Sequence, residues 1–376
     1  MKKINISQVD SIFVNRSYPI EFLIYYKHGL PIDKIRKALK KLSSNFWPVF
    51  GEYFDGQINR MDYTEADYFD LSESQADFNS ADKPENMYQT YHDANLLQGN
   101  KLFFLMVFQY PNGTVLLPKM NHLAGDGYSY FYFLSLLAAV SKDSSIPFKN
   151  SLIKFVSRPH HDRTVLKPFL LKNIKLEKPE AAEKLSIEFV KMPKREIRPF
   201  IKQIALKTNQ TVSSNDILSA IAVQKSYAIQ MHKFSDVFTL TIPIDVRTQI
   251  KEYGAKYFGN GLLFNQTIFN TAEITQTNIE NMAVQIRKSM PVISKENYIT
   301  YLDKIEQQIK NGQTDKLVPY NPFEGCLVTN LSRLPTGKLN FGSGNPDFII
   351  PITIEKNSTV VLAEKDNFIL RLVYQV

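Results

Sequence analysis

Asn121-His122-Leu123-Ala124-Gly125-Asp126-Gly127 is the stretch around which the rest of the chain is organised. An apolar run, residues 114–117, precedes it and predicts a buried strand, and the aromatic and aliphatic run over residues 130–140 predicts a packed helix. His122 therefore stands where a strand ends and a helix is about to begin. Because the backbone is held on both sides of such a position, its side chain can face a cleft in a fixed orientation.

Each residue of this stretch also has a purely structural interpretation. A histidine at a strand end is more often structural than catalytic, Asp126 is a common type of helix cap, and Gly127 permits backbone angles that other residues resist. The spacing His-x-x-x-Asp-Gly arises by chance in roughly one or two chains per hundred of this size. The motif alone is therefore a moderate signal, which becomes strong only if other parts of the chain agree with it.

The composition bounds the class of protein. The chain has 376 residues, of which 44% are hydrophobic and 12% aromatic, as expected for a large core in two domains. No run reaches the ~18 apolar residues that span a bilayer, and the N-terminus lacks the apolar core of a signal peptide. Cys326 is the only cysteine, which excludes an intrachain disulfide and a four-cysteine zinc site. We therefore expect a soluble protein of a reducing cytoplasm.

The net charge and the histidines limit which ligands and partners the chain is expected to bind. The formal net charge of +8 is mild for this length and spread along the chain, which favours an anionic ligand such as a phosphate-bearing cofactor. No zinc-finger spacing or arginine-rich tract supports nucleic acid as a partner. His160-His161-Asp162 resembles a metal cluster, but no further ligand follows at a suitable spacing, so we expect no metal site.

Hydrophobic periodicity predicts that both halves mix sheet and helix. In the first half we expect a strand over residues 20–26, a helix that Pro31 opens, a strand hairpin over 102–109 and 114–120, and mainly loops over 62–86. In the second half we expect helices near residues 199–207, 213–228, 275–290 and 295–310, and strands over 237–244, 325–331, 348–354, 359–363 and 367–374.

These elements suggest a domain organisation. We expect an N-terminal domain over residues 1–150, a crossover linker over 151–195, where the periodicity weakens, and a C-terminal domain over 196–376. Neither a dinucleotide-binding GxGxxG fingerprint nor a P-loop is present. The predicted fold class is α/β, with two domains of mixed sheets and flanking helices that face one another across a ligand channel.

Seven further segments can be compared with known families. In chain order they are Phe46-Trp47-Pro48-Val49-Phe50-Gly51, Asp162-Arg163-Thr164-Val165-Leu166, Thr211-Val212-Ser213-Ser214, Ile244-Asp245-Val246-Arg247, Tyr257-Phe258-Gly259-Asn260, Val328-Thr329-Asn330-Leu331 and Asn340-Phe341-Gly342-Ser343-Gly344. Together with His122-Leu123-Ala124-Gly125-Asp126-Gly127 they cover nearly the whole chain. In these motifs and their order the chain resembles the BAHD acyl-CoA-dependent acyltransferases, relatives of chloramphenicol acetyltransferase and of peptide-synthetase condensation domains.

Three features depart from the family pattern. Asn340 and Ser343 replace the Asp and Trp of the family's Asp-Phe-Gly-Trp-Gly motif, which is thought to shape the domain away from the chemistry. Leu331 stands where plant members often carry a Trp whose ring N–H can reach the reacting oxygen. The chain is also shorter than most plant members and lacks their final helix. We therefore expect a bacterial or otherwise divergent relative with an acceptor of its own.

The residues support the same chemistry. Transfer of an acyl group from a thioester to an alcohol or amine needs a base, and a neutral imidazole is suited to this near pH 7. His122 is the only histidine at a rigid strand end, and no Ser or Cys lies in a nucleophile elbow. We therefore expect direct attack in a ternary complex. Cys326 is the one residue that could form an acyl-enzyme instead, but its simpler interpretation is a buried small hydrophobe.

The family resemblance implies further roles. It implies that Asp126 points away from the substrate and pairs with Arg247, so that the pair holds the loop of His122, and that Gly127 serves the turn. Thr329 is the candidate donor to the oxyanion, which needs a donor at ~2.7–3.1 Å. Ser213 and Ser214 are candidate coenzyme A contacts at a helix N-terminus, with a plain helix cap as the alternative.

The leading hypothesis is an O- or N-acyltransferase that uses acyl-coenzyme A as co-substrate and a small-molecule acceptor, as a monomer without a bound cofactor. An alternative keeps the fold and His122 but takes the acyl group from a carrier-protein thioester, docked on the basic helix near residues 34–41. A third hypothesis is a catalytically silent binding protein, against which the intact His122, Asp126 and Arg247 argue. The acceptor and the acyl chain stay open, since one methylene changes discrimination by only ~1–3 kcal/mol.

Overall fold

The apolar run before His122 forms β7 (Gly113–Asn121), in which all nine residues are buried. The computed structural model describes residues 2–14, 19–91, 100–144, 159–167, 185–230, 236–352 and 355–375. In it β7 is the central strand of a five-stranded sheet with the order β12-β2-β7-β6-β5. Its neighbours are β2 (Pro19–Tyr26), β5 (Phe69–Glu73), β6 (Phe103–Tyr110) and β12 (Phe348–Pro351). The strand is mostly apolar, as expected where both faces are covered, and the buried Lys119 within it pairs with Glu21 of β2 at 3.4 Å.

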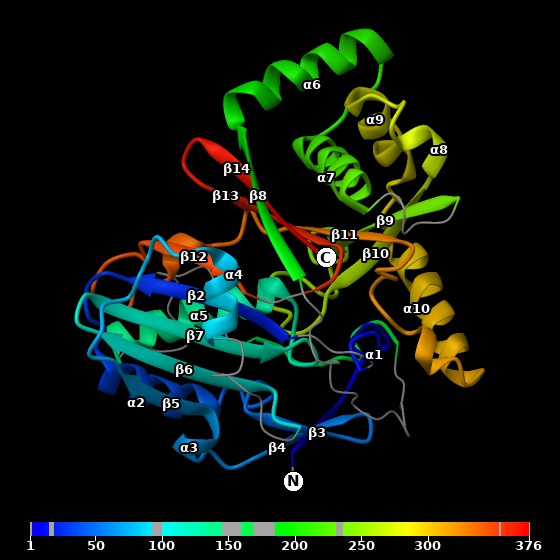
Figure 1. Cartoon of the computed structure of the whole chain (residues 1–376). Helices are drawn as coiled ribbons and strands as arrows, with labels where there is room; N and C mark the ends of the chain where they lie inside the picture. Colours follow the sequence, from blue (N-terminus) through cyan, green and yellow to red (C-terminus); the bar gives the residue numbers. More distant parts are fainter. Residues whose placement is uncertain are drawn as a thin grey trace.

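Helices cover both faces of this lower sheet (Figure 1). On one face α2 (Ile32–Ser43) and α5 (Gly127–Lys142) pack against the first hydrophobic core. On the other face α4 (Pro84–Tyr91) contributes Met87 and Tyr91 to a smaller core. The short helix α3 (Glu65–Tyr68) precedes β5, and a separate small sheet consists of β1 (Lys3–Asn5), β4 (Gln57–Arg60) and β3 (Gly51–Phe54).

The second sheet has six strands in the order β10-β9-β11-β13-β14-β8. They are β8 (Leu185–Pro193), β9 (Val237–Asp245), β10 (Leu262–Asn270), β11 (Gly325–Asn330), β13 (Ser358–Ala363) and β14 (Asn367–Gln375). The helices of this half are α6 (Lys194–Thr208), α7 (Ser214–Gln230), α8 (Thr271–Ile274), α9 (Ile279–Ser289) and α10 (Lys295–Lys310). Among them, α7 and α9 share a second hydrophobic core with the sheet.

The two sheets form the lower and upper parts of the molecule in Figure 1. Two segments, β12 and α1, link the N-terminal and C-terminal halves of the chain. The strand β12 belongs to the C-terminal half but pairs antiparallel with β2, and the short N-terminal helix α1 (Gln8–Ser11) lies beside α10, where Gln8 donates a hydrogen bond to Glu306. The predicted α/β class with mixed sheets is therefore confirmed, but the C-terminal half completes the N-terminal sheet.

Several elements differ from the prediction. The strands β1, β3 and β4 of the small sheet and the short helices α1, α3, α4 and α8 were not predicted. Residues 185–193, placed in the linker from sequence, form β8, an edge strand whose residues are mostly half-buried. The edge strands β5 and β10 were not predicted, because β5 buries only Phe69 fully and β10 buries Asn265 and Thr267 beside apolar residues. The helix expected from Pro199 begins at Lys194, with Pro199 inside it. Residues 151–158 and 168–184 of the predicted linker lie outside the described residues.

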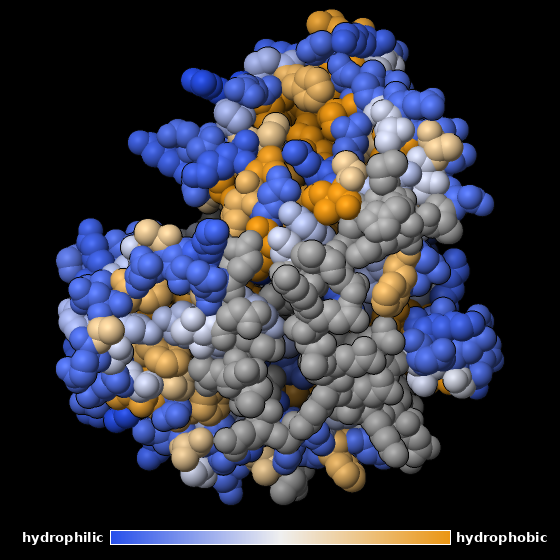
Figure 2. Space-filling model, in the orientation of Figure 1, coloured by the Kyte–Doolittle hydropathy of each residue, from blue (hydrophilic) through white to orange (hydrophobic). Residues whose placement is uncertain are grey.

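Figure 2 shows how hydrophobic and hydrophilic side chains are distributed over the surface, in the orientation of Figure 1. Hydrophobic side chains gather in the upper part of the molecule below α6, whereas hydrophilic side chains dominate its outer edges (Figure 2). The half-buried residues that pack against the second core include Val190, Met192, Phe200 and Ile201. Within the described ranges, no helix is both long enough and apolar enough to cross a bilayer.

Candidate active site

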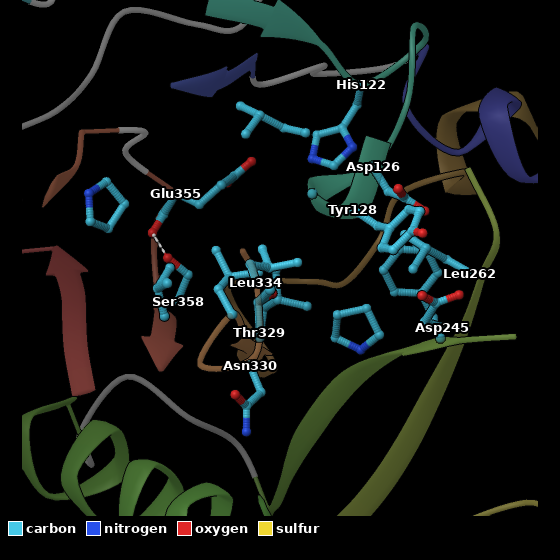
Figure 3. A pocket seen from close by; sticks show the side chains of 18 of the residues that line it. His122, Asp126, Tyr128, Asp245, Leu262, Thr329, Asn330, Leu334, Glu355 and Ser358 are labelled. Carbon is cyan, nitrogen blue, oxygen red and sulfur yellow. Dashed lines mark hydrogen bonds between the residues drawn. The ribbon is translucent and has the colours of Figure 1, made fainter. Parts of the chain in front are cut away.

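A pocket of about 440 Å³ lies between the two sheets, and residues from both line it. His122 extends into it from one side, and Thr329, Asn330 and Leu334 lie across from it (Figure 3). Apolar side chains such as Phe13 and Phe264 make up much of the lining. An apolar enclosure with a few polar groups that converge on it is the usual form of a small-molecule site.

Contacts of both the ring and the backbone hold His122 in place. His122 follows the last residue of β7, and its ring stacks on Phe13 with the ring centroids 4.2 Å apart and the planes 6° from parallel. Its carbonyl oxygen accepts a hydrogen bond of 2.6 Å from the Asn260 side chain. Burial lowers the pKa of His122 to about 4, although Asp126 and Asn260 act to raise it. The ring is therefore neutral at pH 7 and able to accept a proton.

Asp126 lines the pocket but is not available as a second base, because other groups already use both of its carboxylate oxygens. It is the N-cap of α5, and one oxygen accepts from the Ser129 backbone N–H at 3.0 Å. The other accepts from the Gly261 backbone N–H at 3.0 Å. Arg247 adds contacts of 3.0 and 2.9 Å to the two oxygens. Burial raises the pKa of Asp126, but Arg247 and these donors hold it below its ordinary value.

Arg247 joins the two halves of the chain through this pair. Its guanidinium also donates to the carbonyl oxygens of Tyr257 at 3.2 Å and Gly259 at 2.7 Å, and it lies over the ring of Tyr128 at 4.7 Å. Both Asp126 and Arg247 are almost fully buried, with side-chain exposures of 3% and 2%. The arrangement implied by the family resemblance is therefore present, and it fixes the turn after His122 against the second half.

A second buried ion pair supports the same turn and was not foreseen from the sequence. Asp10 of α1 lies 3.0 Å from the Arg163 side chain and accepts a hydrogen bond of 2.7 Å from Asn260. Arg163 also donates to the carbonyl oxygens of Leu123 and Ala124, at 3.2 and 3.0 Å. The only sequence signal for Asp10 is its capping-box spacing from Ser7, a local pattern that says nothing about distant partners.

The glycine that this turn requires is Gly125, not Gly127. Gly127 is the first residue of α5 and needs no left-handed backbone, and a Cβ there would make only an ordinary contact of 3.4 Å with Leu331. A Cβ on Gly125 would lie 2.6 Å from the Cβ of Ser129, which is too close. The conformational role predicted for Gly127 was therefore wrong, and close packing at Gly125 takes its place.

The structure separates the remaining candidates. Thr329 of β11 lines the pocket, but neither Ser213 nor Ser214 is among the described residues that do. The Ser213 hydroxyl accepts from the backbone N–H of Asp216 at 3.3 Å, and the Asp216 carboxylate accepts from the backbone N–H of Ser213 at 2.6 Å, which is a capping box at the start of α7. The hydroxyl also donates to that carboxylate at 2.9 Å. Asn215, the next residue of α7 after Ser214, reaches the pocket wall by accepting a hydrogen bond of 2.7 Å from Asn330.

Other motifs named from the sequence lie away from the pocket. Phe341 is buried against Tyr26, Asn340 accepts from the Gly342 backbone N–H at 2.8 Å, and both Gly342 and Gly344 have positive φ angles of 115° and 102°. His160 and His161 contact the carbonyl oxygens of Tyr253 and Asn45. Across the residues that the structure describes, no three His, Cys, Asp or Glu side chains are grouped as a metal site would require.

Cys326 is buried in the second core and does not line the pocket. Burial raises the pKa of its thiol to about 12, partly offset by a hydrogen bond with Ser226. Because side chains of a strand alternate between its two faces, Leu327 and Thr329 of β11 face the pocket, whereas Cys326 faces the helices.

The fold and the pocket define the class of the protein, an α/β fold of two mixed sheets with flanking helices and a pocket between the sheets that His122 enters. The chain superposes on the crystal structure of vinorine synthase with a TM-score of 0.76 and 16% identity, over 100% of this chain and 90% of that one. It superposes on F. sporotrichioides TRI101, complexed with coenzyme A and T-2, with a TM-score of 0.73 and 16% identity, over 99% and 95%.

The sequence comparison gives the family. The profile of the Transferase family matches residues 62–367, so the chain belongs to this family, that of the BAHD-type acyltransferases. One relative is spermidine hydroxycinnamoyltransferase 1 of Oryza sativa subsp. japonica, which is 22% identical over 269 residues, or 63% of this chain. The matched region spans 59% of the length of that rice protein.

Proposed function

We propose that the protein transfers an acyl group from acyl-coenzyme A to a hydroxyl or amine acceptor by direct attack in a ternary complex. The family and the fold similarity to a coenzyme A complex support the donor. The observation that carries the proposal is a neutral, oriented imidazole, that of His122, in a pocket between the two sheets. The name of the rice relative makes an amine such as spermidine one acceptor to test.

The proposed steps use only the side chains of the pocket and the two substrates. The His122 imidazole takes the proton of the acceptor as its oxygen or nitrogen attacks the thioester carbonyl carbon. The carbonyl oxygen becomes an oxyanion, for which the Thr329 hydroxyl is the proposed donor. The intermediate then expels the coenzyme A thiolate, to which the imidazolium returns the proton. The ester or amide and free coenzyme A leave, and His122 is neutral again.

Coenzyme A is proposed to reach the pocket beside the N-terminus of α7. The Asn215–Asn330 hydrogen bond joins that helix start to the pocket wall. A helix N-terminus presents backbone N–H groups and the positive end of the helix dipole, which suits a phosphate. The Ser213 hydroxyl is already engaged in the capping box, so Ser214 is the better candidate of the two for a direct contact.

The test is release of free thiol from a panel of acyl-coenzyme A donors with pooled alcohols and amines, followed by mass spectrometry of the products. Acylated acceptor together with free coenzyme A is the expected result. Without thiol release from any donor, coenzyme A is not the carrier, and the proposal fails in its present form.

A carrier-protein thioester is the second candidate donor. The observation that favours it is the exposed side of α2, where Lys34, Lys37 and Lys40 project into solvent and could meet an acidic carrier. Arg36 is less available, since it contacts Asp33 and Glu65. Charge reversal in the double variant Lys37→Glu/Lys40→Glu is expected to slow transfer from a carrier thioester and to leave transfer from acyl-coenzyme A unchanged.

A monomeric state and a cytoplasmic location stay predictions.

The pH dependence of kcat/KM is a prediction from His122. Because burial holds its pKa at about 4, the ring stays an unprotonated base until the pH approaches 4, whereas an ordinary histidine is half protonated near pH ~6.5. With an alcohol acceptor, which does not itself titrate in this range, we expect kcat/KM to be constant from about pH 8 to about pH 5.5 and to halve near pH 4. An acid limb centred near pH 6.5 would contradict this assignment.

The same shift affects stability and needs a control. The unfolded chain binds a proton at His122 with a pKa of ~6.5, and the folded chain does so only near 4. The unfolded state thus binds more protons between these values, so the free energy of unfolding falls as the pH drops from 6.5 to 4. Circular dichroism at each pH separates loss of fold from protonation of the base.

Cys326→Ala is expected to leave kcat and KM within about twofold of the wild type, because the thiol is buried away from the pocket and its raised pKa disfavours a thiolate. Mass spectrometry of the protein after incubation with acyl-coenzyme A alone is expected to show no acyl adduct. A covalent adduct that disappears in the variant would overturn the direct-attack mechanism.

A further inference from the structure

Two carboxylates that line the pocket, Asp245 and Glu355, have no role in the proposed mechanism. Asp245 is the last residue of β9 and lines the pocket beside Pro243, Leu262 and Tyr128. Its side chain is 40% exposed, whereas those of Asp126 and Arg247 are almost fully buried. Figure 3 shows Asp245 near Leu262 and Tyr128, on the side of the pocket away from Glu355 and Ser358. Asp245 is therefore the accessible member of this charged group.

Asp126, Asp245 and Arg247 form a hydrogen-bonded group that contains two carboxylates and one guanidinium. The five N–H groups of the Arg247 guanidinium share six acceptors, namely the Tyr257 and Gly259 carbonyls, the Ser129 hydroxyl, both oxygens of Asp126 and one oxygen of Asp245. Both oxygens of Asp126 also accept from backbone N–H groups. One guanidinium thus faces two carboxylates. His122 adds no positive charge at pH 7, since its ring is neutral.

Asp245 uses one oxygen in these contacts. Its Oδ1 accepts from the Arg247 backbone N–H at 2.9 Å and from the Arg247 side chain at 3.0 Å. Burial raises the pKa of Asp245, Arg247 lowers it, and the nearby Asp126 raises it again. A second cation beside Oδ2 would relieve both the burial and the repulsion from Asp126. Within this group, two carboxylates thus share one guanidinium; the pocket lining also includes one further cation, Arg333, and one further carboxylate, Glu355.

We infer that Asp245 is a specificity-determining residue that binds a protonated amine of the acceptor, and that the acceptor class is therefore diamines and amino alcohols. This inference rests on the proposed acyl transfer. The attacking nitrogen or oxygen must reach His122 with a lone pair free, and loses its proton to the imidazole. A second nitrogen further along the chain keeps its proton and forms a charge-assisted hydrogen bond with Asp245.

If Asp245 had only a structural role, its substitution would not discriminate between charged and neutral acceptors. Asp245 also closes a turn, because its Oδ1 accepts the N–H of Arg247 two residues on. Asp245→Asn keeps this acceptor and the shape of the side chain but removes the charge. If Asp245 serves only the turn, the variant treats charged and neutral acceptors alike.

The experiment compares matched acceptors of equal chain length, namely 1,4-diaminobutane, 1-aminobutane and 1-butanol, with wild type and Asp245→Asn. For the diamine we expect KM to rise about 10- to 100-fold, the range given by a charged hydrogen bond. For the other two we expect KM within about twofold and kcat unchanged for all three. Asp245→Glu is expected to retain the preference for the diamine, which shows that the charge matters.

Thr248→Ala is the control variant, since Thr248 is a neutral residue of the same pocket wall. It is expected to leave the diamine preference intact. Equal losses with all three acceptors in Asp245→Asn, or a wild type without preference for the diamine, would overturn the inference while acyl transfer itself stands.

A binding measurement keeps the two proposals apart. Calorimetric titration of 1,4-diaminobutane into wild type and Asp245→Asn needs no turnover and is done alongside circular dichroism, which reports whether the variant is folded. If no acceptor is acylated but the diamine binds wild type more tightly than Asp245→Asn, the proposed function fails and the cation site stands. If the diamine binds neither protein, or both equally, the cation site fails.

Discussion

His122→Ala is expected to reduce kcat by ~10²–10⁴-fold, the usual contribution of a general base, while the protein stays folded. The ring is the only imidazole among the described residues that line the pocket. Asp126 cannot replace it, because both of its oxygens are occupied by Arg247 and backbone N–H groups. Removal of the ring also leaves a space beside Phe13, which stacked on it, so some loss of stability is expected as well.

The measurement is thiol release and product formation with the best acyl-coenzyme A donor, together with a thermal unfolding curve for each protein. His28→Ala is the matched control, because His28 is an exposed histidine on the chain that follows β2. It is expected to have the activity of the wild type. If His122→Ala turned over at the wild-type rate, the assignment of the base would be wrong and another group of the pocket would have to be considered.

Asp126→Asn is expected to destabilise the protein by ~3–5 kcal/mol, the range found when one partner of a buried ion pair is removed. The variant keeps a side-chain oxygen for the helix cap but leaves Arg247 without its bidentate partner, in a setting where that guanidinium is almost fully buried. The loss has a catalytic consequence too, because the pair holds the turn that follows His122. We expect a lower kcat even at temperatures where the variant is folded.

Urea unfolding of Asp126→Asn, Arg247→Gln and the double variant measures the pair directly. Because removal of both charges leaves no stranded ion, the double variant should lose less free energy of unfolding than the sum of the two single changes. Simple additivity would show that the pair is not coupled. A wild-type urea midpoint for Asp126→Asn would show that the pair does not stabilise the fold.

Much of the fold could be predicted from sequence, and the strands of the two large sheets that were missed have a common cause. The strands β2, β6, β7 and β9 lie within a few residues of their predicted places, since their apolar residues are nearly continuous or alternate clearly. Edge strands have one covered side and a mixed composition. For this reason β5 and β10 were not predicted, and β8 was placed in the linker.

The site could be predicted in part. The motif located His122 after a strand and Asp126 at a helix cap, because both are local features of one short segment. The family resemblance led to Arg247, which lies 121 positions further along the chain. Nothing local indicated that Asp10 and Arg163 form a second buried pair, or that Phe13 stacks on the imidazole.

The sequence by itself determined the order of most strands and helices, the strand–turn–helix geometry at His122 and the family, because each depends on neighbours in the chain or on a series of motifs. Only the tertiary structure decided which distant side chains meet. The sheet pairing of β12 with β2, the ion pair of Asp10 with Arg163 and the position of Asp245 in the pocket wall all depend on contacts between segments more than a hundred residues apart. Local periodicity carries no information about such contacts, since it reports only which face of an element is buried.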